Sequence, residues 1–354
     1  VENTASIPSF TETPAKPIAG TAVTRFGERS GLARVGSCAS FRAVSALSEF
    51  DAPSADSVAF GPFWRSNCMV LTPSRVAAVS LHVIPRKSLS RMLGGLSRIS
   101  APERVLDPIV ATYCRVYGVE LGDCVLPESG FRSFDEFFTR RLKPGTRPIP
   151  DDETHVLSPA DGRLEAAGVI DGDARLVIKG STYSVAELLG DGDGAEFEGG
   201  HFFVVYLSPR DYHRVHAPVG GPVCAVHHVD GTLFPVNRIG VAHIPRLFAR
   251  NERVAVHQTS AVHGRVCTVM VGAIGVGRIS LAFDDKVLTN AGPPGGLKVY
   301  SDGMAPKLER AEELGTFHLG STAIVFLRPE GQWQLAKQVG DTVRMGEAVV
   351  RRVG

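Results

Sequence analysis

The pattern of apolar and polar positions changes character along the chain. Between residues 79 and 150 apolar residues recur at helical spacing, which predicts helices over 81–99, from Ala101 to Tyr117 and from Ser133 to Arg141. From residue 151 onward short apolar runs alternate with Gly and Pro turns, which predicts strands, among them Phe202 to Leu207, Val254 to Val256, Val266 to Val271 and Ala323 to Leu327. We therefore expect an α+β protein in which an N-terminal helical segment precedes a β-rich core, sandwich or barrel-like, over 151–354.

The first 78 residues differ from the rest. They are rich in Ser, Ala, Pro and Thr and show little sustained periodicity, so we expect a poorly ordered or atypical extension. Between Arg25 and Arg42 the segment is basic with few acids, which is faintly typical of a transit peptide, although no cleavage site can be identified.

The stretch 81–99 carries a narrow apolar stripe. Leu89, Met92, Leu93 and Leu96 follow helical spacing, and basic residues stand close to them, namely Arg86, Lys87, Arg91 and Arg98. Such a helix can lie in a lipid interface and attract anionic headgroups. A helix packed against the core is the alternative, and periodicity alone does not separate the two.

Composition removes several classes of function. With 38 basic and 37 acidic residues among 354, the chain gives no case for nucleic-acid binding. The six cysteines show no CxxC spacing, so they are interpreted as reduced, buried thiols of a cytoplasmic protein, and no metal site is expected. No apolar run reaches the roughly 20 residues that span a bilayer, so any membrane contact would be peripheral.

A glycine-serine step, Gly320-Ser321, stands directly before the apolar run Ala323 to Leu327. A serine hydroxyl can attack the preceding carbonyl if a base removes its proton and donors stabilise the oxyanion, and Gly320, lacking Cβ, lets the groups approach. Elimination across Ser321 would then release the upstream chain and leave a pyruvoyl group on a new C-terminal fragment. A tight turn into a core strand is the interpretation that this step favours by itself.

An acid and two histidines stand far upstream, Asp161 in Pro-Ala-Asp-Gly and His213 and His216 in Asp-Tyr-His-Arg-Val-His. A serine nucleophile needs an imidazole as base, and the imidazole needs a carboxylate to fix its tautomer. Their odd spacing places the two histidines on opposite faces of an extended strand, so both reach one site only if the segment turns or bulges. An Asp-Gly turn and hydrogen-bonded structural histidines are the alternatives.

With these motifs the chain resembles the phosphatidylserine decarboxylases of the bacterial and mitochondrial type, from about Leu81 to the C-terminus. The resemblance is carried by Leu-Gly-Ser-Thr at 319–322, by His-Arg-Val-His at 213–216, and by the segments 134–145, 157–164, 251–254 and 271–277. No catalytic position of the family's pattern is missing.

The resemblance implies a self-processing enzyme. Asp161, His216 and Ser321 would form the self-cleavage triad, and the chain would be cut between Gly320 and Ser321 into a β chain (1–320) and an α chain (321–354). Ser321 would become a covalent pyruvoyl cofactor, which takes the amine of phosphatidylserine as a Schiff base and serves as the electron sink for loss of carbon dioxide, giving phosphatidylethanolamine. His213 is the candidate general acid that quenches the carbanion.

The resemblance also implies where the protein acts. The expected partners are phosphatidylserine, an anionic membrane surface and the protein's own two cleaved chains, with a homodimer left open. A peripheral position on the cytoplasmic face of the cell membrane is favoured over the mitochondrial inner membrane.

Two other functions stay open. One is a pyruvoyl decarboxylase of a soluble amino acid, which shares the cleavage chemistry. The other is a non-enzymatic carrier or binding module, because Val339 to Glu347 resembles a hairpin of lipoyl carrier folds, although the usual modification site is absent.

Overall fold

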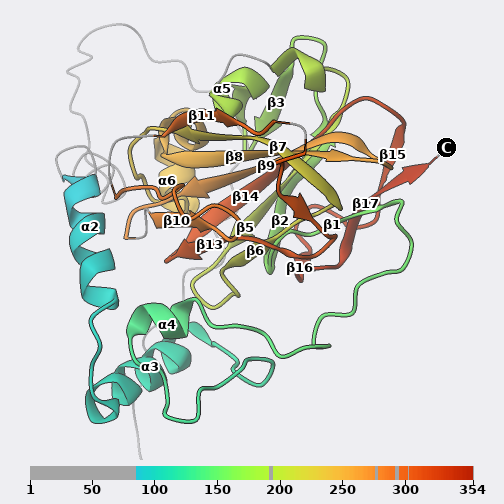
Figure 1. Cartoon of the computed structure of the whole chain (residues 1–354). Helices are drawn as coiled ribbons and strands as arrows, with labels where there is room; N and C mark the ends of the chain where they lie inside the picture. The colour runs from blue at the N-terminus through green and yellow to red at the C-terminus, as the bar shows by residue number, and fades with distance from the viewer. Residues whose placement is uncertain (1–84, 191–193, 276–277, 292–294, 302, 354) are drawn as a thin grey trace, which may run out of the picture. The chain divides into compact units, whose positions relative to one another are not determined.

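The computed structural model describes residues 85–353, apart from 191–193, 276–277, 292–294 and 302 (Figure 1). The chain divides into two units, Val1–Asn67 and Cys68–Gly354, and the fold described below belongs to the second. The predictions for residues 1–78, the transit-peptide interpretation included, lie outside the described residues.

The predicted helices are confirmed with small changes of boundary. They are α2 (Arg86–Ser97), α3 (Glu103–Tyr117) and α4 (Phe134–Phe138). The hydroxyl of Ser133 accepts a hydrogen bond from the Glu136 N–H at 3.1 Å, so Ser133 is the N-cap that the sequence predicts. α3 ends at Gly118, whose φ of +69° is the left-handed conformation that commonly terminates a helix.

The predicted β-rich core is confirmed, and its centre is one nine-stranded sheet. All of its pairs are antiparallel. The order is β11 (Gly296–Val299), β7 (Gly221–Val229), β8 (Arg253–Ser260), β9 (Gly264–Gly272), β14 (Ser321–Leu327), β5 (His201–Leu207), β2 (Gly162–Val169) and β16 (Thr342–Val343), and β12 (Lys307–Leu308) also pairs with β7. This order is open, so the sheet does not close on itself as a barrel would.

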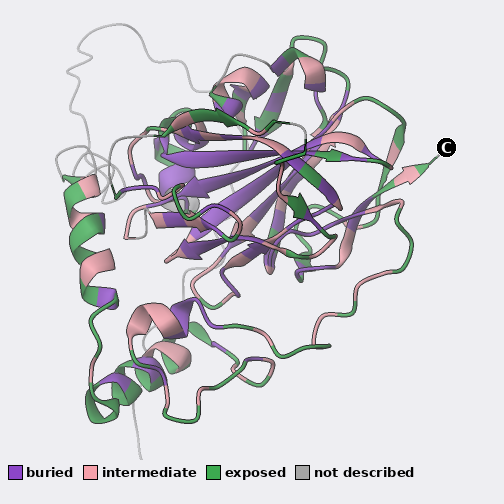
Figure 2. Cartoon of the chain, viewed as in Figure 1, coloured by how far each residue is buried: buried purple, intermediate pink, exposed green. Residues whose placement is uncertain are grey.

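Both faces of the central sheet are covered. One face packs against α5 (Val185–Leu189), the 3₁₀ turn η1 (Gly194–Phe197), α6 (Arg238–His243), α7 (Leu247–Arg250) and the hairpin of β3 (Arg175–Ile178) and β4 (Ser181–Ser184). The other packs against two three-stranded sheets, β10 (Arg278–Leu281), β13 (Glu313–His318) and β6 (Arg214–His216), and β1 (His155–Leu157), β17 (Ala348–Val353) and β15 (Gln332–Leu335). The central strands are therefore buried on both sides, as Figure 2 shows.

The central position of β14 explains why the sequence from Ala323 to Leu327 is a continuous apolar run. It lies between β5 and β9, and every residue from Ser321 to Leu327 is buried. Side chains alternate along a strand, so Ile324 and Phe326 face the helices while Ala323 faces the small sheet of β10, β13 and β6. Ser321, two residues before Ala323, therefore points toward that small sheet.

α2 turns its apolar stripe away from the core. Its buried residues are Ser90 and Ser97, whereas Met92 and Leu96 are each 63 % exposed. Polar contacts hold the helix in place: the Ser90 hydroxyl accepts the Gly275 N–H at 3.1 Å, and Arg91 donates to the Asn290 side chain at 3.1 Å. The alternative of a helix that packs its apolar stripe into the core does not match this arrangement.

The cysteine prediction holds in part. None of the four cysteines in the described ranges is in a disulfide, and Cys124 and Cys267 are buried. Cys114 and Cys224 are only partly buried, so the prediction of burial is wrong for these two. Cys114 lies in α3, one side of which is exposed. Cys224 lies in β7, near the edge of the central sheet, where only the short strand β11 lies beyond it.

Candidate active site

Ser321 begins β14 and lies opposite Leu207 of β5 and Gly272 of β9. Its side chain is fully buried, and among the described residues its hydroxyl has no hydrogen-bond partner. A buried hydroxyl normally finds a partner, because leaving it unsatisfied costs about 1–3 kcal/mol. An orphaned hydroxyl at a strand terminus is therefore a candidate nucleophile.

The residues just before Ser321 form a strained turn. Leu319 has φ of +82° and Gly320 has φ of +49°, so both adopt left-handed backbone conformations. For a residue with a Cβ this conformation costs on the order of 1–3 kcal/mol and needs surrounding structure to hold it. The Leu319 side chain supplies that hold by packing against the aromatic cluster of Phe131, Phe137 and Phe138.

His213 lies next to this cluster, immediately before β6. Its ring contacts that of Phe138, with 4.1 Å between centroids and the ring planes tilted by 43°, and its backbone carbonyl accepts the Phe317 N–H at 3.0 Å. The Nδ1 atom donates to the Asp211 carbonyl at 2.8 Å, so the free lone pair of the neutral ring is on Nε2. This Nε2 has no partner within the described ranges, and burial lowers the pKa of His213 to about 3.

His216, at the other end of β6, has different surroundings. Its Nδ1 donates to the Ala311 carbonyl at 2.7 Å, and its Nε2 accepts the Tyr212 hydroxyl at 3.1 Å. Burial lowers the pKa of His216, so this imidazole is also neutral at pH 7. The two histidines thus make separate contacts, as their odd spacing in the sequence predicts for an extended strand.

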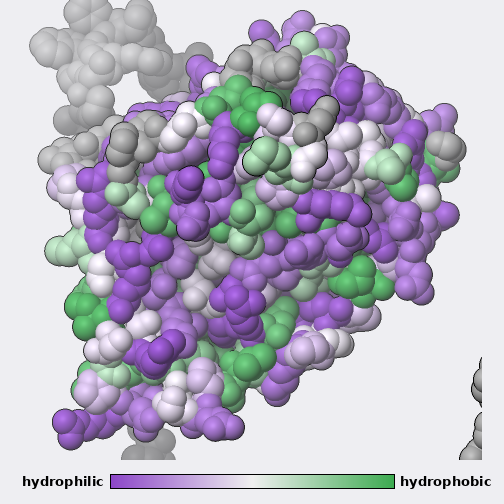
Figure 3. Space-filling model, in the orientation of Figure 1, coloured by the Kyte–Doolittle hydropathy of each residue, from purple (hydrophilic) through white to green (hydrophobic). Residues whose placement is uncertain are grey.

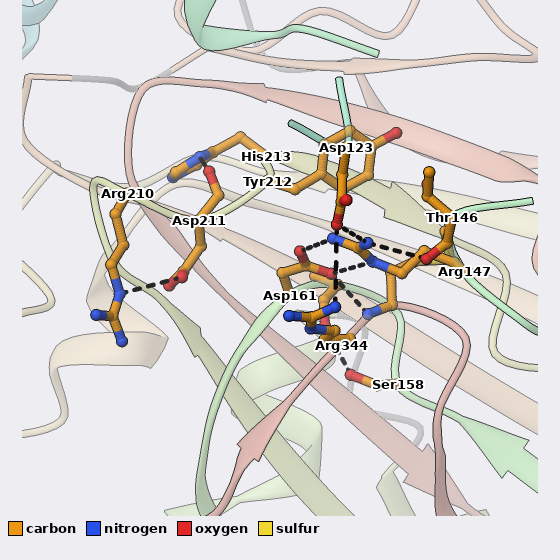
Figure 4. Close-up of polar contacts among 12 residues, drawn as sticks. Asp123, Thr146, Arg147, Ser158, Asp161, Arg210, Asp211, Tyr212, His213 and Arg344 are labelled. Carbon is orange, nitrogen blue, oxygen red and sulfur yellow. Dashed lines mark hydrogen bonds and ion pairs between the residues drawn. The ribbon is translucent and has the colours of Figure 1, made fainter. Parts of the chain in front are cut away.

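Asp161 ends the loop before β2, and its carboxylate is held by other groups. Arg147 Nη2 lies 2.7 Å from Oδ2, and the Met345 N–H donates to Oδ1 at 2.8 Å. Arg147 also binds Asp123 at 2.8 Å, so one guanidinium bridges two carboxylates (Figure 4). The turn needs glycine after Asp161, because a Cβ on Gly162 would lie 2.3 Å from the Tyr206 carbonyl oxygen.

Strand register places Asp161 relative to Ser321. Arg163 of β2 pairs with Tyr206 of β5, and Tyr206 in turn pairs with Thr322 of β14. Asp161 therefore lies two strands away from Ser321, or about 10 Å across the sheet. His216 is next to the Asp161 loop, since its N–H donates to the Pro159 carbonyl at 2.7 Å.

A polar cavity of about 200 Å³ opens at Asp161. Its charged lining is balanced, with four arginines, Arg140, Arg147, Arg210 and Arg344, and four carboxylates, Glu120, Asp123, Asp161 and Asp211. Arg140 is 5 % exposed; its Nη2 donates to the carbonyls of Arg210 and Asp211, while Nε and Nη1 have no partner in the described structure. A buried cation with free donors beside a cavity can bind an anion.

The structure thus adds three residues that the sequence did not single out by role: Arg140, Arg147 and Tyr212. Arg140 lies in the segment 134–145 and Tyr212 in the motif before His213, so both were present in the motifs that carry the resemblance. Their roles depend on contacts with residues far apart in the chain. No spacing rule could have revealed those contacts.

Comparison with known proteins agrees with these motifs. Residues 134–351 match the family model of phosphatidylserine decarboxylase. The phosphatidylserine decarboxylase proenzyme of Myxococcus xanthus is 38 % identical over 271 residues, covering 76 % of this chain and 95 % of that protein. Those of Methylococcus capsulatus and an Anaeromyxobacter species are 38 % and 39 % identical and cover 78 % and 77 % of this chain and 97 % of each relative. The chain belongs to the phosphatidylserine decarboxylase family.

Proposed function

We propose that the chain is a proenzyme that cuts itself between Gly320 and Ser321 and then converts phosphatidylserine to phosphatidylethanolamine and carbon dioxide. The observation that carries this proposal is the buried, unpartnered hydroxyl of Ser321 directly after a left-handed turn. Its relatives are named as proenzymes of the same activity. The products would be a β chain (1–320) and an α chain (321–354).

In the cleavage step the Ser321 hydroxyl attacks the carbonyl carbon of Gly320. His216 takes the hydroxyl proton and passes it to the departing nitrogen of Ser321, so that the amide becomes an ester. The triad of Asp161, His216 and Ser321 is supported by the short backbone link between His216 and the Asp161 loop. Asp161 is bound by Arg147 in the uncleaved chain, so its contact with His216 requires a change of partner.

The ester would then eliminate and leave dehydroalanine at 321, and hydrolysis by one water molecule would release ammonia and give the pyruvoyl group. The residues present fit such a group, because Ser321 is buried and its side chain points toward the small sheet, whose strand β6 ends at His216 and directly follows His213. Once formed, the pyruvoyl carbonyl would supply the electron sink for decarboxylation, so no dissociable cofactor is needed.

His213 is proposed as the acid that returns a proton to the substrate carbon after carbon dioxide leaves. Its ring is buried against Phe138, and its Nε2 has no partner among the described residues, so one ring nitrogen is available. Because burial lowers the pKa of His213 to about 3, the ring is neutral in the uncleaved chain. An anionic substrate beside it would raise that pKa and favour the protonated form that an acid requires.

The cavity at Asp161 is proposed to receive the polar headgroup of the lipid. Phosphatidylserine carries a phosphodiester and a carboxylate, and arginine binds both by charge-assisted hydrogen bonds. The free Nε and Nη1 of the buried Arg140 support this assignment.

A membrane surface is proposed on α2 and α3. Met92, Leu96 and Ile99 are at least 60 % exposed on and just after α2, and Val105, Ile109 and Val116 are exposed along one side of α3. Apolar residues appear at the corresponding lower left of Figure 3. Arg98, Arg104 and Arg115 are also exposed there, which favours anionic lipid. The second helix is an addition to the surface that the sequence predicts.

Three of the four basic residues expected to bind headgroups make contacts with the core. Arg86 stacks on Phe234 at 4.0 Å, Lys87 pairs with Asp230, and Arg91 binds Asn290. Among the helices in the described part of the chain, none combines the length and apolar character that crossing a bilayer requires. A peripheral position on the cytoplasmic face of the membrane is therefore our proposal.

The two alternative functions are not favoured. Membership of the phosphatidylserine decarboxylase family argues against a lipoyl-like carrier. A soluble amino acid as substrate would not account for the exposed apolar residues of α2 and α3.

The decisive experiment replaces Ser321 by Ala. The variant should stay one intact chain without decarboxylase activity, whereas the parent should give a C-terminal fragment beginning at 321 with a pyruvoyl mass. Thr268→Val is the matched control, because Thr268 is buried beside β14 and its hydroxyl is also unpartnered among the described residues. A parent protein that is active but uncut, with an ordinary serine at 321, would falsify the proposal.

A further inference from the structure

A second cluster of charged side chains lies next to the turn of Leu319 and Gly320. It consists of Arg278, His318 and Asp135. β10 and β13 are neighbours (Figure 1), and Arg278 is directly paired with His318, three residues before Ser321. Cross-strand partners have their side chains on the same face. Ser280, two residues along β10, shares that face, and its hydroxyl lies 3.1 Å from His318 Nε2.

His318 is held on both ring nitrogens. Its Nδ1 lies 2.9 Å and 3.0 Å from the two carboxylate oxygens of Asp135 in α4, and Ser280 occupies Nε2. Both carboxylate oxygens of Asp135 therefore contact the same nitrogen of His318. This pair anchors the strand end that leads into the left-handed residues Leu319 and Gly320.

Arg278 has no comparable partner. Its Nε is buried without a hydrogen bond, and its guanidinium is in no ion pair within the described part of the chain. Burial lowers the pKa of Arg278, the positive charge of Arg98 acts in the same direction, and the negative charge of Asp135 opposes both. An arginine remains protonated at neutral pH even so. Arg278 is thus a partly desolvated cation without a bound anion.

Self-cleavage would create an anion close to the strand end that pairs with Arg278. Gly320 is two residues beyond His318, so it lies at most about 7 Å further along the chain. An arginine side chain extends its guanidinium about 6 Å from Cα, given bonds of about 1.5 Å. When the ester eliminates, the carboxylate of Gly320 becomes the new C-terminus of the β chain.

We propose that the guanidinium of Arg278 binds the carboxylate of Gly320 as self-cleavage releases it, and that it thereby accelerates the elimination step. This inference rests on the proposed cleavage between Gly320 and Ser321. In that step a neutral histidine of the site takes the Cα proton of Ser321, a double bond forms between Cα and Cβ, and the Cβ–Oγ bond breaks. The electron pair of that bond leaves with the Gly320 carboxylate, where Arg278 stabilises the developing charge.

The effect can be measured on the ester itself. The ester has the same mass as the uncut chain, but hydroxylamine cleaves it and yields a fragment that begins with serine. Arg278→Gln, which keeps most of the side chain's volume, should slow formation of the pyruvoyl fragment roughly 10- to 100-fold. This is less than the 10²–10³ of removing a fully buried donor, because Arg278 is partly exposed. A hydroxylamine-sensitive fraction larger than that of the parent should accumulate.

Arg278→Lys should restore part of the rate, since it keeps the charge. Arg98→Ala is the matched control: it removes a neighbouring exposed cation and should leave the rate within about twofold, a surface change being mild. Melting temperatures of all variants, measured with Ser321→Ala also present, check that each one folds.

Three results would overturn the inference. The first is an Arg278→Gln variant that matches the parent in rate and accumulates no ester, and the second is one that is blocked in cleavage and forms no ester. The third is normal maturation with a raised KM for phosphatidylserine vesicles, which would show that Arg278 binds an anionic group of the phospholipid and not the carboxylate of Gly320. A parent protein that does not cut at Gly320 would instead remove the proposed function, and the parent sample in the same assay reports that separately.

Discussion

The carboxylate of Asp161 is bound by the guanidinium of Arg147 through two contacts, 2.7 Å to Oδ2 and 3.4 Å to Oδ1. Both side chains are largely buried, at 8 % and 15 % exposure. In the described structure no hydrogen bond joins Asp161 to His216, whose Nε2 accepts the Tyr212 hydroxyl instead. Arg147 therefore holds in place the carboxylate that we propose as the acid of the triad.

We predict that Arg147→Ala slows self-cleavage and lowers the free energy of unfolding by up to about 3 kcal/mol, because a largely buried pair loses one partner. Cleavage should be followed by intact mass over time. If Arg147 acts through Asp161, the same change made in Asp161→Asn should have no further effect on the cleavage rate. Arg344→Ala is the control, since Arg344 lines the same cavity but is exposed. Independent, additive losses would show that Arg147 has only a structural role.

Substitution of the two histidines should have different effects on self-cleavage and on decarboxylation. His216→Ala should leave the chain uncut, because Ser321 loses its base. His213→Ala should still release the fragment 321–354 with its pyruvoyl cap, yet decarboxylate phosphatidylserine roughly 100- to 10,000-fold more slowly. Mass and carbon dioxide release from lipid vesicles should be measured on one preparation. Failure of His213→Ala to cut would assign His213, whose Nε2 is free, to the cleavage step.

The buried His213 should make the fold sensitive to acid. Burial lowers its pKa to about 3 in the folded chain, against about 6.5 when unfolded. Between these values the unfolded chain binds the proton more readily, so stability falls as the pH falls from about 6.5 toward 3.

At pH 5 His213 lowers the free energy of unfolding by about 2 kcal/mol relative to its value at neutral pH. Denaturant unfolding of Ser321→Ala at pH 7 and at pH 5 should show this loss of stability. When His213→Gln is added to the same protein, the loss between pH 7 and pH 5 should be smaller by about 2 kcal/mol. Parallel pH curves for the two proteins would contradict the prediction.

Leu96 should contribute to membrane binding. It is 63 % exposed on α2, and Leu→Ala removes three carbon atoms, each worth at most about 0.8 kcal/mol on insertion into lipid. With partial insertion we expect about tenfold weaker sedimentation with phosphatidylserine-containing vesicles. Leu297→Ala is the matched control, because Leu297 is 53 % exposed on a strand, β11, and belongs to neither helix of the proposed membrane surface. Equal losses for both variants would rule out a specific role for α2.

The sequence by itself determined the broad fold class and the main helices and central strands, and it supplied the candidates for the chemistry-bearing residues. These features are local: helical spacing over 101–117, a serine N-cap at 133 and an apolar run after Ser321 can each be recognised within a few residues. The family motifs around Asp161, His213, His216 and Ser321 are likewise contiguous.

Only the tertiary structure decided what those residues touch. Arg147 binds Asp161 from a loop before β1, Arg140 presents free donors from the end of α4, and Arg278 meets His318 through strand pairing. The direction of the α2 stripe was also undecided, because an amphipathic helix has the same periodicity whether it faces a core or a membrane. Such contacts join residues far apart in the chain, and their energies depend on burial, which arises only when the strands and helices pack together.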